Sequence, residues 1–255
     1  MKHFDFTIDF ETCALSANAA IMQVAVVPWL RDAQDDPFAV ADDLGEVTED
    51  EAARWPDPYE AYVDLRSCVV EGMDFDTATI DWWSRQSDEA KHAVCQGLAE
   101  PIADVTVGIL DYLRDIVAQY QLDSICLWAH GDTDISQLRS LCRRFDIDLE
   151  DTVPHTSFRD CRTVILEAAH AKYRKDIKDA NKDLHGGDKI VSSMMIGGKM
   201  TPCDPDKYLS RPNEAYLLFP TLPSRYTEGR CLHDALYDAV RSTWYTWQAL
   251  RTLRD

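Results

Sequence analysis

An almost wholly apolar run of eleven residues, AAIMQVAVVPW at 19–29, limits the possible fold more than any other part of the sequence. A run of this length that is rich in Val and Ile is typical of a central strand buried on both faces of a sheet. The segment His3–Phe10 alternates with apolar side chains at every second position, which predicts another strand. The fold must therefore include a sheet with a well-covered centre.

The remaining apolar patterns predict an α/β protein with a mixed sheet flanked by helices. Further strands are expected at Ala61–Cys68 and Ser124–His130, and a short one from Phe158. Helical spacing predicts helices over 76–85, from 87 onward, and over 104–120, 134–145, 163–170 and 232–253.

We expect one domain over residues 1–255, because a chain of this length buries enough apolar surface to fold as a unit. Residues 31–60 carry eleven acids, two basic residues and three prolines, which predicts an exposed acidic insertion with a short helix at Glu49–Arg54. Residues 171–230 begin with a basic stretch and continue as a proline-rich, irregular insertion.

The formal net charge of −19 argues against a protein that grips long duplex DNA, because basic surface supplies most of that affinity. The charge is compatible with an enzyme that holds only the last few nucleotides of a strand. Eight scattered cysteines without a Cys-x-x-Cys pair argue against structural zinc and predict reduced thiols in a cytoplasmic protein. The sequence shows neither a secretion signal nor an apolar run of about 18 residues, so we expect no membrane span.

Acidic residues occur at three points where a site built on a sheet would place them. Asp9 and Glu11 are two positions apart on the first strand, so their side chains point to the same face. Asp134 opens the helix that follows a strand. His233 and Asp238 are five positions apart on the predicted last helix, about 1.4 turns, so we expect them to diverge somewhat. They could reach one metal cluster from two sides, but we do not expect both to ligate the same ion. Four carboxylates suit Mg²⁺ or Mn²⁺, and a histidine can take a proton from water.

Each of these residues also has a simpler explanation. An Asp-x-Glu pair among 45 acids is commonly a solvated strand end. Asp134 taken alone is better explained as a helix N-cap, worth about 1 kcal/mol. His233 alone would be a surface or core histidine. The combination, with the last pair in an apolar helix, favours a site.

Three longer motifs carry a family resemblance. Asp74–Trp83 with Gln86–Ala90 resembles D-x-x-T-x-x-W-W…Q-S-x-E-A, Arg159–Thr163 resembles R-D-x-R-T, and His233–Ala239 resembles H-x-A-L-x-D-A. These segments are similar to those of the DEDD superfamily of 3′–5′ exonucleases, in its DEDDh branch. The resemblance is closest to the phage exonuclease A type and related bacterial exoribonucleases, and it spans about residues 4–245.

The resemblance implies an RNase H-like fold and two Mg²⁺ or Mn²⁺ ions. Asp9 would bridge both ions, with Glu11, Asp134 and Asp238 completing the ligand set and His233 acting as general base. The implied reaction releases 5′-mononucleotides from the 3′ end of single-stranded DNA or RNA. Many relatives are dimers, so a homodimer is a candidate assembly.

The middle motif departs from the family pattern. It reads His130-Gly-Asp132-Thr-Asp134, where relatives have Asn-Gly and an aromatic before the aspartate. We choose Asp134 as the ligand because the helical pattern follows it, with Asp132 as the alternative.

Basic residues of the 171–230 insertion have two interpretations. They could contact phosphates of the entering strand, or they could form a solvated helix face with ion pairs four residues apart. The residues concerned are Lys172, Arg174, Lys175 and Lys178.

Two other functions stay open. One is a catalytically idle RNase H-like scaffold that binds nucleic acid or a protein, and the other is a metal-dependent nucleotide phosphatase. The choice between DNA and RNA depends on contacts to the 2′-hydroxyl. The sequence does not indicate a residue that makes such a contact.

Overall fold

The structure is a computed structural model of the chain. It describes residues 4–38, 57–180, 182, 193–196, 199–202 and 209–254. The chain forms two compact units, one of residues 1–160 with 224–243 and one of residues 161–223 with 244–255. The expectation of one domain with insertions stays a prediction.

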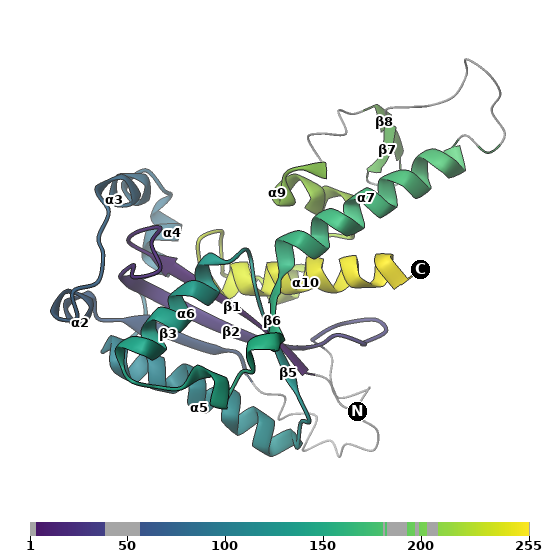
Figure 1. Ribbon diagram of the computed structural model, residues 1–255. Helices are drawn as coiled ribbons and strands as arrows, with labels where there is room; N and C mark the ends of the chain where they lie inside the picture. The colour runs from purple at the N-terminus through teal and green to yellow at the C-terminus, as the bar shows by residue number, and fades with distance from the viewer. Residues whose placement is uncertain are drawn as a thin grey trace. The chain divides into compact units, whose positions relative to one another are not determined.

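The first unit is built on a six-stranded mixed sheet in the order β4-β3-β2-β1-β5-β6 (Figure 1). β1 is antiparallel to β2 and parallel to β5, while β2–β3 is antiparallel and β5–β6 and β3–β4 are parallel. This arrangement confirms the expected α/β class and the RNase H-like sheet. The strands are β1 (Phe4–Thr12), β2 (Ile21–Leu30), β3 (Tyr59–Val63), β4 (Ala99–Glu100), β5 (Ile125–Ala129) and β6 (Phe158–Asp160).

The two central strands are buried on both faces. All ten residues of β2 are buried, as the apolar run predicted. β1 buries Phe4, Phe6 and Ile8 completely on one side and Thr7 on the other. The Thr7 hydroxyl accepts a hydrogen bond from the Thr243 hydroxyl at 2.7 Å. A strand enclosed in this way gives the residues at its end a fixed position.

Helices pack around this sheet, with α5 against β3 and α6 against β1 and β5. Asp76 and Ser87 cap α3 and α4 through side-chain bonds to backbone N–H groups, which confirms the helix starts expected at these residues. The helices are α2 (Leu65–Val70), α3 (Thr77–Ser84), α4 (Asp88–Ala93), α5 (Ile102–Tyr120), α6 (Thr133–Arg144) and α10 (Ala235–Arg254), with short 3₁₀ turns η1 (Leu149–Asp151), η2 (His155–Ser157) and η5 (Ser224–Tyr226).

Two expected elements have different bounds. The strand expected at Ala61–Cys68 ends at Val63, because Asp64 caps a helix there by accepting from the Arg66 N–H at 3.1 Å. The last helix begins at Ala235 and not at 232, because His233 has a positive φ of 67° that no right-handed helix accommodates.

Both ends of the expected acidic insertion are attached to the folded sheet. At one end, Arg31 forms two bonds of 2.8 and 2.9 Å to the buried Asp5 carboxylate, which also accepts from the Trp128 indole at 2.7 Å. At the other end, Glu60 is part of β3. The helix expected at Glu49–Arg54 lies outside the described residues.

The second unit holds α7 (Cys161–Ala180), the antiparallel pair β7 (Ser193–Ile196) and β8 (Lys199–Pro202), α9 (Pro212–Ala215), η4 (Tyr216–Leu218) and the last turns of α10. The Tyr216 and Tyr245 rings stack at 4.1 Å, and the Trp244 indole donates to the Pro220 carbonyl at 2.8 Å. α7 is longer than the helix expected over 163–170, so the basic stretch begins on a helix. In the described part of the chain, no helix combines the length and the apolar character that crossing a membrane requires.

Candidate active site

Two of the expected site residues lie at the end of β1. Asp9 and Glu11 point to one face of the sheet, and Glu11 is 8% exposed. The pairing of β1 with β2 becomes irregular between Glu11 and Thr12. The Trp83 indole donates to the Thr12 carbonyl at 2.9 Å, which fastens the end of the strand to α3.

Asp134 lies in the first turn of α6, just after β5. It is 8% exposed, whereas Asp132 is exposed and occupies the N-cap position without a side-chain cap bond. The N-cap explanation of Asp134 is therefore wrong, because Asp134 is already inside the helix. Since β1 and β5 are parallel, their carboxyl ends bring Asp134 to the same edge of the sheet as Asp9 and Glu11.

His233 and Asp238 are connected directly. The His233 backbone N–H donates to the Asp238 carboxylate at 2.9 Å. Ligand atoms of Glu11, His233 and Asp238 all lie within 4.8 Å of one another. The expected divergence of His233 and Asp238 is wrong, because His233 precedes the helix in the left-handed conformation. Both side chains therefore contribute to one group with Glu11, whose ligand atoms are close enough to share a cation.

Burial and mutual repulsion raise the pKa values of the acids in this cluster. The pKa of Glu11 rises to about 9, first through burial and then through the charges of Asp238, Asp134 and Asp234. Burial also raises the pKa of Asp9 well above its usual range, and neighbouring carboxylates, with Asp134 the largest, add to this. Burial raises the pKa of Asp238 as well, opposed by the hydrogen bond from the His233 N–H.

Such a cluster fits a divalent cation. Its donors are carboxylate oxygens, which hard cations prefer, with one imidazole nitrogen beside them. Buried like charges destabilise one another, and a bound cation removes that repulsion. The donor set therefore fits a hard divalent cation.

A cavity of about 450 Å³ adjoins the cluster, with Glu11 and Asp134 in its wall. Phe10, Leu15 and Trp82 supply apolar lining. Trp82 is 38% exposed and Trp83 only 8%, so Trp83 belongs to the core and Trp82 faces the cavity. The Trp82 and Trp83 rings meet the His233 imidazole edge to face, with centroid separations of 4.8 and 6.0 Å.

The basic residues expected to contact substrate lie on α7 in the second unit. The Lys172 ammonium pairs with the Asp176 carboxylate at 3.0 Å, four residues along the helix. Arg174, Lys175 and Lys178 are exposed. A role for these four residues in binding nucleic acid stays a prediction.

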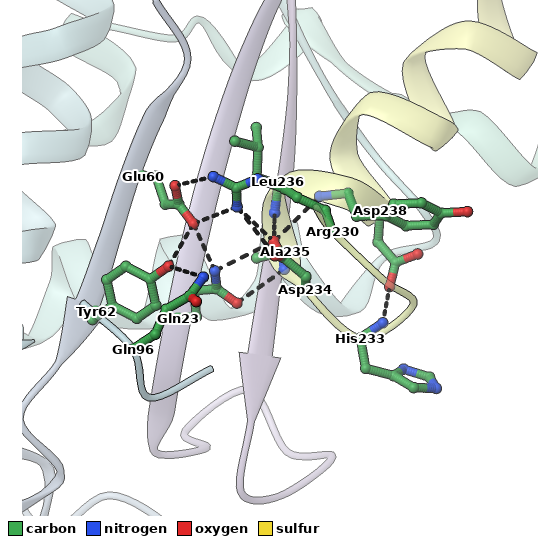
Figure 2. A network of polar contacts seen from close by, with 11 residues as sticks. Gln23, Glu60, Tyr62, Gln96, Arg230, His233, Asp234, Ala235, Leu236 and Asp238 are labelled. Atoms are coloured by element: carbon green, nitrogen blue, oxygen red, sulfur yellow. Dashed lines mark hydrogen bonds and ion pairs between the residues drawn. The ribbon is translucent and has the colours of Figure 1, made fainter. Parts of the chain in front are cut away.

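Sequence reasoning missed a polar network beside the site (Figure 2). The Arg230 guanidinium donates to both oxygens of Glu60 at 2.7 Å and to both oxygens of Asp234 at 3.0 and 3.1 Å. Gln23 on β2 joins the same groups. No local sequence pattern predicts these contacts, since Arg230 and Glu60 are 170 positions apart.

The sheet and the cluster define an α/β protein with a partly buried acidic site at the carboxyl ends of parallel strands. A family model described as the 3′-5′ exoribonuclease Rv2179c-like domain matches residues 5–187. The chain belongs to this family, which places it in the expected superfamily of 3′–5′ exonucleases.

Solved structures of exonuclease I show a more distant similarity. E. coli exonuclease I in complex with a dT13 oligonucleotide is 13% identical, with a TM-score of 0.41 over 69% of this chain and 31% of that chain. Exonuclease I without ligand is 12% identical, with a TM-score of 0.43 over 96% of this chain and 42% of that chain. The chain thus spans about a third of the length of the first of these proteins. No curated protein matches the sequence.

Proposed function

We propose that the protein is a metal-dependent 3′–5′ exonuclease that shortens single-stranded nucleic acid to 5′-mononucleotides. The observation that carries this proposal is the convergence of Glu11, His233 and Asp238 within 4.8 Å. The charges of Asp9 and Asp134 act on the same group. Membership of a family described as 3′-5′ exoribonucleases supports the reaction and its direction.

Asp9, Glu11, Asp134 and Asp238 would hold two Mg²⁺ or Mn²⁺ ions. When bound, such ions neutralise the scissile phosphate and lower the pKa of water. The burial of Asp134 and the exposure of Asp132 support Asp134 as the ligand of the middle motif. A ligand enclosed by the fold keeps its place without a substrate, whereas an exposed side chain on a loop does not.

His233 would act as general base. Its imidazole lies at the cluster and is bordered by the Trp82 and Trp83 rings, which limit its rotation. In this place it can accept the proton of an attacking water within the cluster. Its backbone N–H meanwhile fixes the Asp238 carboxylate, so one residue orients both the base and a ligand.

The adjoining cavity suits the terminal nucleotide. A base has an apolar face that stacks on aromatic side chains, and Trp82 offers such a face at the cavity wall. The family description favours RNA as the natural substrate. Phosphates farther along the strand would contact Lys172, Arg174, Lys175 and Lys178.

Two broader expectations belong to the same proposal. None of the described cysteines forms a disulfide, and Cys203 lies outside the described residues. Unpaired thiols suit the reducing cytoplasm, where we place the enzyme. A homodimer remains the proposed assembly by analogy with the superfamily.

The test uses 5′-labelled single-stranded DNA and RNA of one sequence, incubated in Mg²⁺, in Mn²⁺ and in EDTA. The wild type should give a ladder that shortens from the 3′ end by single nucleotides. EDTA and Asp9→Ala should abolish the ladder, while the matched control Asp132→Ala should keep it. Release of inorganic phosphate instead would indicate a phosphatase. Intact strands under every condition would leave a binding scaffold as the better reading.

A further inference from the structure

The segment that carries His233 is tied to the sheet by one arginine. Arg230 makes two parallel bonds of 2.7 Å to the Glu60 carboxylate on β3 (Figure 2). The same guanidinium reaches both oxygens of Asp234. Its side chain is 25% exposed, that of Glu60 19%, and that of Asp234 1%. Two-point pairing fixes direction as well as distance, which a lysine ammonium does not do.

Asp234 passes this constraint to the start of α10. Its carboxylate accepts from the N–H groups of Leu236 at 3.0 Å and Tyr237 at 3.3 Å, which caps the helix. The Gln23 side chain accepts from the Ala235 N–H at 3.0 Å and donates to Glu60 at 2.9 Å. The first turn of α10 is therefore fastened to β2 and β3.

We call the ion pairs of Arg230 with Glu60 and Asp234 the clamp. His233 lies between Arg230 and Asp234 in the sequence. Its φ of 67° belongs to the left-handed region, which a residue with a side chain adopts only when its surroundings hold it there. That backbone conformation lets the His233 N–H reach Asp238 and brings the imidazole to Trp82. Any loosening of the clamp would release the strained residue first.

We propose that Arg230 is a positioning residue whose ion pairs with Glu60 and Asp234 hold His233 at the acidic cluster. The expected effect of Arg230 on the rate rests on the proposed function. The expected effect of Arg230 on the position of His233 rests on the contacts alone. The bonds of Arg230 go to Glu60 and Asp234, so we infer that its effect on the cluster passes through His233.

Arg230→Gln should lower kcat by roughly 10²-fold, the usual cost of misplacing a catalytic group by about 1 Å. KM should change little, because the cavity wall is intact. In a His233→Ala background the same substitution should cost nothing further, since the group that it positions is already gone. Arg230→Lys should lie between the wild type and Arg230→Gln.

A second readout needs neither metal nor substrate. The imidazole protons of His233, assigned with His233→Ala, should show ring-current shifts from Trp82 and Trp83 in an NMR spectrum recorded in EDTA. Arg230→Gln should move these resonances toward the position of an exposed histidine. The control Arg114→Gln makes the same substitution at a more exposed arginine, which pairs with Asp111 at 3.2 Å on α5, and it should leave the resonances unchanged.

Unchanged His233 resonances in Arg230→Gln, or rate losses that add to those of His233→Ala, would overturn the proposal. Should Arg230→Gln fail to fold, Glu60→Gln tests the same pair from its other side with the same two outcomes. The two assays distinguish failure of the exonuclease hypothesis from failure of the proposed role of Arg230. An absent ladder with shifted resonances refutes the exonuclease and keeps the clamp, while a ladder with unmoved resonances does the reverse.

Discussion

Replacing Glu11 by glutamine removes one of several carboxylates that repel one another inside the protein. The side chain is only 8% exposed, so water screens its charge poorly. Glutamine has nearly the same shape and carries no charge. In the absence of metal, we therefore expect Glu11→Gln to be more stable than the wild type.

The size of the effect follows from the pKa. Burial, followed by the neighbouring charges, raises the pKa of Glu11 from 4.5 to about 9. Because the folded state then holds a proton that the unfolded chain has released, stability must fall as pH rises through this window. Between pH 4.5 and pH 7 the loss is about 1.4 kcal/mol per unit, or up to about 3 kcal/mol in all. The glutamine side chain does not titrate, so the variant does not lose this stability as the pH rises.

The assay is guanidinium unfolding in EDTA at pH 5, 7 and 8.5. The advantage of Glu11→Gln should be small at pH 5 and grow with pH. The control Glu150→Gln changes a side chain that is 64% exposed and should have little effect at any pH. In Mn²⁺ at 100 times its Kd the advantage of the variant should shrink, because the wild type gains about 2.7 kcal/mol from binding and the variant has lost a ligand. A variant less stable than the wild type in EDTA at pH 8.5 would refute the reasoning.

Two further substitutions test neighbouring parts of the structure. Asp134→Ala should abolish metal-dependent cleavage in the ladder assay, whereas Asp132→Ala should retain it; the opposite result would move the ligand to Asp132. Asp5→Ala should lower the free energy of unfolding by roughly 3–5 kcal/mol, because it removes the carboxylate to which the Arg31 guanidinium and the Trp128 N–H donate. A loss below about 1 kcal/mol in guanidinium unfolding would show that water replaces the lost partner.

Local patterns predicted the parts of the fold that local interactions decide. The run at 19–29 became β2 because its composition suits only a position buried on both faces. Helix starts at Asp76 and Ser87 were readable because each carries its own cap. The strand expected at Ala61–Cys68 exists only as far as Val63, since its pattern alone does not separate the end of a strand from a short helix. Asp64 was the missed signal.

The sequence was enough to name candidate residues of the acidic site, but not to predict how they are arranged. Spacing placed His233 one and a half turns from Asp238 on a helix, but Asp234 caps that helix and leaves His233 outside it. An aspartate just before an apolar helix is a signal that could have been used. The clamp of Arg230 on Glu60 had no such signal, because long-range ion pairs leave no local pattern.

The site joins residues that are far apart in the sequence, and this order has a consequence during synthesis. Gln23 and Asp234, which are hydrogen-bonded in the folded protein, are 211 positions apart. A ribosome that adds about 5–20 residues per second needs on the order of 10–40 s to cover that interval. Throughout it, the nascent chain carries Asp9 and Glu11 but has neither His233 nor Asp238. The group of Glu11, His233 and Asp238 can therefore assemble only after residue 238 has been made.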